Sequence, residues 1–224
     1  MLYISDYDIF VAPLRSMIIT LQLIVSISSI FIAFISGYYI KKKNPNIKRS
    51  YLFGIPVFFL FFGIMRCILI FHDFYASDDI SMPLYLIANI FLIMAFISFN
   101  YTIESNIYTK SKYIFTIIGI ILLILFIIST LASWTLFRRI LINIIIIVQI
   151  LPPFTIYFNV AWKGSGVSKK RAEFIIIGII FLYLSSILGI LDLLNLLDLI
   201  STTFLAQPLL LIGLVSLGYG LIIV

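Results

Sequence analysis

Seven long apolar runs, separated by short polar or basic segments, make up most of the chain. A helix needs about 20 residues to cross a hydrocarbon core of about 30 Å, and each run approaches or exceeds that length. The runs lack the two-residue alternation of membrane barrel strands, so their backbone amides have to pair within helices. The pattern predicts an all-α integral membrane protein, a single seven-transmembrane-helix bundle. Its spans are expected at roughly 16–40, 51–72, 84–101, 113–132, 140–162, 174–192 and 203–223 of residues 1–224.

The basic residues between the runs predict an orientation. Lys and Arg are concentrated in the segments after the first, third and fifth runs, whereas only Arg15, Arg138 and Arg139 lie on the opposite side. Because positive residues collect in cytoplasmic loops, we expect the N-terminus outside and the C-terminus inside. No basic segment or cleavage site precedes the first run, so that run is expected to remain as a helix. The inner basic loops are expected to contact anionic lipids.

Composition supports the same class of protein. Hydrophobic residues form 63% of the chain and charged residues 11%, and the mean hydropathy is +1.23, which excludes a soluble domain and indicates a multi-pass protein of the cell membrane. The net charge of +6 lies in loops, so we expect the lipid bilayer, not nucleic acid, as its partner. With one cysteine, Cys67, and one histidine, His72, we expect no disulfide, metal site or cofactor.

Catalytic classes of seven-helix proteins are excluded by residue type. The seventh run has no lysine for a retinal Schiff base. The single histidine is predicted at an outer edge, where it cannot join a buried serine, and Asp192 is the one aspartate expected at depth. We therefore expect no enzymatic activity.

The segment GIMRCILIFHDF places Arg66 inside the second run. A charged side chain at the centre of a bilayer costs about 2.5–3.5 kcal/mol on insertion scales, so a partner is expected. Asp73 lies two helical turns away on the same face, and Asp192 is predicted at similar depth on the sixth run. Arg66 is interpreted either as a lock between helices or as the floor of an outward-facing pocket for an anionic or polar ligand.

Further candidates for this pocket lie at the outer edge. His72 is beside Asp73 and is interpreted as an interfacial ring or as a proton sensor. Asp192, Asn195 and Asp198 recur every third residue, either as an amphipathic exit turn or as a polar stripe facing Arg66. The predicted pocket residues are Arg66, His72, Asp73, Asp192 and Asn195.

The fifth run contains Pro152 and Pro153 near its middle. Two prolines remove two amide donors, so the helix is expected to kink or open and to leave carbonyls without partners. The break is interpreted either as a packing kink or as a transport site lined by Asn143 and Gln149.

In its short loops, outer N-terminus and basic first inner loop YYIKKKNPNIKRSYLFG, the chain resembles the seven-helix input regions of prokaryotic signalling proteins, such as those ahead of histidine kinases. The resemblance implies a role in signal transduction. Since no kinase module follows the seventh run, a stand-alone sensor, receptor-like protein or scaffold with an unidentified membrane or cytoplasmic partner is expected. The segment QILPPFTIYFNVAWKGSG resembles PQ-loop transporters of three-plus-one-plus-three type, although it lacks their Pro-Gln pair, so a small-molecule transporter is the alternative.

Overall fold

The computed structural model describes residues 11–43, 49–132, 134–193 and 199–222. Within these ranges seven helices are long and apolar enough to cross a membrane, which confirms the predicted number of spans. Most of the helices continue beyond the predicted runs, most of all α3, α6 and α1, because a helix does not have to end where the apolar sequence ends, whereas α4 lies within its predicted run. They are α1 (Val11–Lys43), α2 (Arg49–Phe74), α3 (Asp78–Asn106), α4 (Ile114–Leu131), α5 (Thr135–Lys163), α6 (Gly166–Leu193) and α7 (Leu199–Ile222), with a short 3₁₀ helix, η2 (Thr109–Ser111), before α4.

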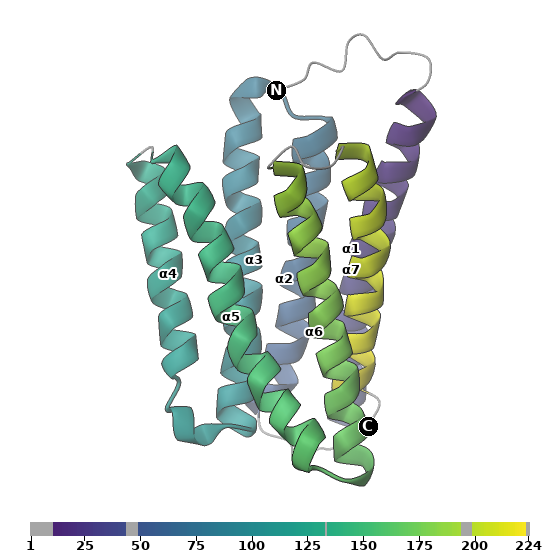
Figure 1. The fold of residues 1–224 in the computed structure, drawn as a ribbon, viewed down its shortest axis with the longest axis vertical. Coiled ribbons are helices and arrows are strands. Elements are labelled where there is room, and N and C mark those ends of the chain that lie inside the picture. The colour runs from purple at the N-terminus through teal and green to yellow at the C-terminus, as the bar shows by residue number, and fades with distance from the viewer. Residues whose placement is uncertain (1–10, 44–48, 133, 194–198, 223–224) are drawn as a thin grey trace.

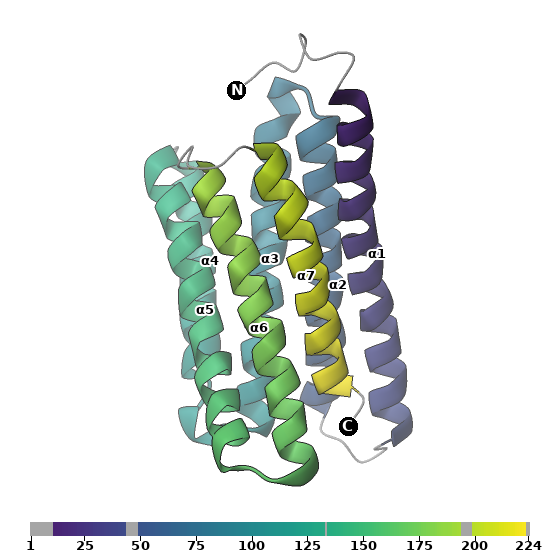
Figure 2. The same cartoon turned by 45° about the vertical axis from the view of Figure 1, so that its right-hand side comes forward.

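The helices form two layers of three. Helices α1, α2 and α3 form one layer, and α5, α6 and α7 form the other (Figures 1 and 2). The layers join where α1 packs on α7 and where α3 packs on α5, and these joined helices run in the same direction. Helix α4 stands at one edge against α3 and α5.

The basic segments at the ends of α1, α3 and α5 lie at one end of the bundle, as the alternation of helix direction requires. The opposite end, where α1 begins and α2 ends, is called the outer end here, after its predicted orientation.

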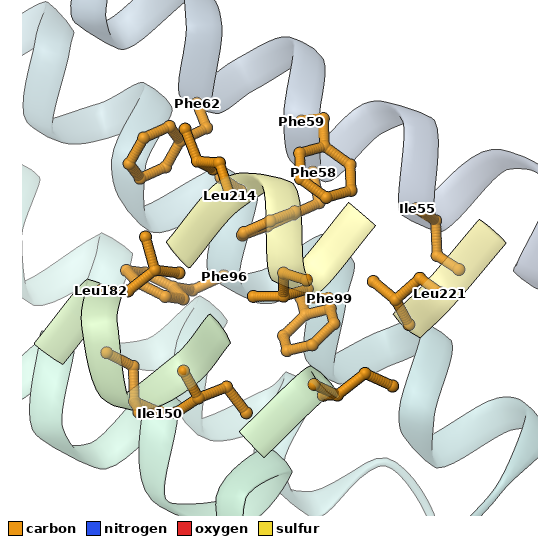
Figure 3. Close-up of a cluster of buried hydrophobic side chains, with 14 of the residues drawn as sticks. Ile55, Phe58, Phe59, Phe62, Phe96, Phe99, Ile150, Leu182, Leu214 and Leu221 are labelled. Atoms are coloured by element: carbon orange, nitrogen blue, oxygen red, sulfur yellow. The ribbon is translucent and has the colours of Figure 1, made fainter. Parts of the chain in front are cut away.

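Aromatic side chains fill the space between the two layers (Figure 3). Phe58 of α2 packs on Phe99 of α3 with ring centroids 5.0 Å apart, and both are buried. Ile150 of α5 and Leu182 of α6 approach from the opposite layer. The cavity that remains among them measures about 10 Å³ and is lined by apolar side chains, so it has room for one water molecule at most.

Candidate functional site

Arg66 is held by a neutral side chain of another helix. Its Nη2 donates a hydrogen bond to Oε1 of Gln207 on α7, and Gln207 is buried. Arg66 itself is partly exposed, but its Nε is buried and has no hydrogen-bond partner among the described residues. The guanidinium therefore bridges α2 and α7 and keeps an unused donor.

Arg66 and Asp73 do not form a direct salt bridge. Oδ1 of Asp73 lies 2.6 Å from Nδ1 of His72, and in the described part of the chain Arg66 has no carboxylate within 4.0 Å. Asp73 pairs with its neighbour His72, and Arg66 bonds Gln207 of α7, so the two charges attract each other only without direct contact.

The remaining pocket candidates lie apart from Arg66 or outside the described residues. His72 and Asp73 form a pair at the outer end of α2, with side chains 24% and 40% exposed, and the His72 ring is 5.6 Å from that of Tyr85. The backbone of Asp192 belongs to α6, but its side chain lies outside the description, as does all of Asn195. The pairing of Arg66 with Asp192 stays a prediction.

Helix α1 contributes polar residues that the prediction did not include. Ser26 Oγ donates to the carbonyl of Gly63 at 2.8 Å and also lies 2.8 Å from Cys67 Sγ. One turn earlier, Gln22 is 4% exposed, and its Oε1 is buried without a hydrogen-bond partner among the described residues. The sequence does contain a signal, because Gln22, Ser26 and Ser29 follow helical spacing on an otherwise apolar run.

The proline pair does not interrupt α5, which is helical through Pro152 and Pro153. Pro153 has no amide hydrogen to donate to the carbonyl of Gln149 four residues earlier. Instead, Nδ2 of Asn100 on α3 donates to that carbonyl at 3.0 Å and to Gln149 Oε1 at 2.6 Å. The expectation that this carbonyl would lack a partner is therefore wrong, because a side chain of the neighbouring helix replaces the missing amide.

The residues of the alternative transport site are only partly brought together. Gln149, Pro152 and Pro153 are buried in the packed region beside α3. Asn143 is six residues earlier in α5, about 9 Å toward the outer end, and is partly exposed.

Replacing Asn100 by Leu is expected to destabilise the protein by about 1–2 kcal/mol, because the Gln149 carbonyl and side chain lose their donor inside the bundle. Thermal unfolding in lipid nanodiscs measures the effect. Asn159→Leu is the matched control, since Asn159 is exposed and donates to Thr155 within its own helix. Equal stability of the two variants would contradict the assigned role of Asn100.

Two charged residues outside the predicted pocket are also buried. Arg138, predicted in an outer loop, is 5% exposed in α5, and its Nη2 donates to Met82 Sδ at 3.6 Å. Glu104 of α3 is 2% exposed and accepts hydrogen bonds from the first turn of α4. Both residues lie near the ends of apolar runs, where sequence position alone does not reveal burial.

The fold and these contacts define an integral, multi-pass membrane protein whose described part contains seven helices long and apolar enough to span a membrane, with polar contacts between them. Comparison with protein-family models, with curated proteins and with solved structures gave no match. A functional assignment therefore has to rest on the chemistry of the polar contacts.

Proposed function

We propose that this protein is a membrane sensor or receptor-like module that binds a polar, anionic ligand at Arg66. The observation that supports the proposal is the partner of Arg66, which is the neutral carboxamide of Gln207. A carboxamide can satisfy one donor of the guanidinium, but it does not neutralise its charge.

An anion is the ligand that such a group favours. A guanidinium within a bilayer is costly unless it is paired, and the attraction between opposite charges is stronger there than in water. Arg66 is partly exposed and still has an unused donor at Nε, so an incoming carboxylate would gain both charge pairing and a hydrogen bond.

The contact also suggests how binding would be transmitted. A ligand that draws Arg66 away from Gln207 would favour a different packing of α2 against α7. Helix α7 packs closely along α6, and α6 begins at the inner basic segment that contains Lys169, Lys170 and Arg171. In this proposal a signalling partner and anionic lipids meet the protein at that inner segment.

Propionate is expected to stabilise the protein in nanodiscs, and the neutral isostere propionamide is not. At about ten times the dissociation constant, binding contributes about 1.4 kcal/mol, which raises Tm by roughly 3–6 °C. Arg66→Gln should abolish this shift, whereas Lys169→Gln, at an exposed inner position, should retain it. A shift that persists in Arg66→Gln, or no shift with the wild type, would overturn the proposal.

A transporter of three-plus-one-plus-three type is the second candidate. It is favoured by the two layers of three helices, α1–α3 and α5–α7, with α4 at the edge. Where the layers join, α1 packs on α7 and α3 packs on α5, and the two helices of each pair run in the same direction. A transport path would have to separate the Phe58 and Phe99 packing. Proteoliposomes distinguish the two functions: a sensor takes up no radiolabelled alanine above protein-free vesicles, and uptake would replace the sensor proposal by the transporter.

A further inference from the structure

Among the five buried side-chain atoms that have no hydrogen-bond partner within the described residues, two lie on the neighbouring helices α1 and α2. One is a donor, Nε of Arg66 on α2, and the other is an acceptor, Oε1 of Gln22 on α1. Buried polar groups in proteins are nearly always paired. One bound molecule that accepts at one end and donates at the other would satisfy both atoms.

Helix register places Gln22 at about the depth of Arg66. Gln22 is one turn before Ser26 on the same face of α1, and Ser26 is bonded to Gly63 of α2. Gln22 therefore lies against α2 about one turn nearer the outer end than Gly63, which is the direction of Arg66.

The register between α1 and α7 gives the same result. A Cβ on Gly218 of α7 would lie 2.9 Å from the Ile32 side chain of α1, so these two residues are at equal depth. Gln207 precedes Gly218 by eleven residues, and Gln22 precedes Ile32 by ten, in helices that run in the same direction. The two carboxamides therefore lie at similar depth. Gln207 of α7 bonds Arg66 directly, and α1, which carries Gln22, packs against α2.

We propose that Gln22, Arg66 and Gln207, here called the three-helix polar site, bind a small monocarboxylic acid that carries a hydrogen-bond donor on the neighbouring carbon. This class comprises α-hydroxy and α-amino acids. The carboxylate accepts from Arg66 Nε, and the hydroxyl or amino group donates to Gln22 Oε1. The inference rests on the proposed function, since it assigns the ligand class of the same cation.

The choice of a single carboxylate follows from the charges of the site. Arg66 is the only cation of the three residues, and the two carboxamides are neutral, so a second carboxylate would have no counter-charge in the site. The requirement for a donor follows from Gln22. A ligand without a donor leaves the buried Oε1 unpaired, and sites that contain a buried hydrogen-bonding group discriminate strongly against such analogues.

Propionate, lactate and alanine test this inference because they share one carbon frame and differ at the neighbouring carbon by a hydrogen, a hydroxyl or an amino group. Binding to the wild type in nanodiscs is measured by titration calorimetry. We expect lactate or alanine to bind about tenfold more tightly than propionate, as one additional hydrogen bond allows. Gln22→Met keeps the length of the side chain but removes the acceptor, so it should abolish this preference and make the affinities for the three acids similar.

Thr20→Val is the control on the same helix, since Thr20 is exposed and bonded to Ser16 within α1; it should retain the preference. Equal binding of the three acids to the wild type would overturn this inference even if Gln22→Met fails to fold, because the ligand series needs no variant. In that case propionate binding that depends on Arg66 would still support the proposed function. If propionate binding did not depend on Arg66 either, this inference and the proposed function would both be wrong.

Discussion

Replacing Glu104 by Ala is expected to destabilise the protein by about 3 kcal/mol or more, one of the two largest effects predicted here. The Glu104 carboxylate accepts hydrogen bonds from the backbone amides of Phe115 and Thr116 at 2.9 and 2.8 Å, and from the Thr116 hydroxyl. The preceding residues, Lys112 and Tyr113, have φ of 49° and 64°, a strained conformation, and Tyr113 at the N-cap position of α4 makes no side-chain capping hydrogen bond. Glu104 therefore supplies the cap for α4 from α3.

Thermal unfolding in nanodiscs measures this effect, and Tm should fall by roughly 6–12 °C for a chain of this size. Glu104→Gln should have an intermediate effect, because an amide group can accept at only one of the two positions. Glu173→Ala is the matched control: Glu173 is exposed and lies 4.0 Å from Lys169, so its loss should change stability little. If Glu104→Ala were as stable as Glu173→Ala, the capping role would be wrong.

Replacing Gly178 by Ala is expected to destabilise the contact between α6 and α7 by about 3 kcal/mol. A Cβ on Gly178 would lie 2.8 Å from the Gly213 carbonyl oxygen and 2.8 Å from the Leu217 amide nitrogen. Both are backbone atoms, so a rotamer change cannot relieve the clash and the two helices have to separate. Close approach of small residues is a main source of helix association in membranes, where lipid competes with apolar side chains.

Gly37→Ala is the control for this variant, because a Cβ at Gly37 would meet Pro56 at 3.6 Å, an ordinary van der Waals contact. It should unfold at nearly the wild-type temperature, or slightly above it, since alanine favours helix over glycine by about 1 kcal/mol. Similar unfolding temperatures for the Gly178 and Gly37 variants would show that α6 and α7 do not depend on this approach.

The number and approximate limits of the membrane helices could be predicted from the sequence, because they follow from the thickness of the bilayer and from the need of every backbone amide for a partner. The grouping of the basic segments at one end followed as well, since seven alternating helices place them there. These features depend on local composition, which can be read along the chain without knowledge of helix packing.

Individual polar contacts were harder to predict. The sequence identified Arg66 as a residue that needs a partner, but Gln207, which is 141 residues away, becomes its neighbour only when α7 packs beside α2. Asp73 was the nearer candidate along the chain, yet its carboxylate contacts His72, and Arg66 bonds Gln207.

The proline pair in α5 likewise separates what the sequence determines from what helix packing determines. The sequence alone determines that the Gln149 carbonyl loses its helical donor, because Pro153 lacks the amide hydrogen. That Asn100 replaces the donor was decided by the tertiary structure, since it depends on the rotation and depth of α3 against α5. Sequence thus determined which polar groups require partners in the bilayer, and helix packing decided which partners they meet. The physical reason is that hydrogen bonds between helices depend on the depth and rotation of each helix, which hydropathy does not encode.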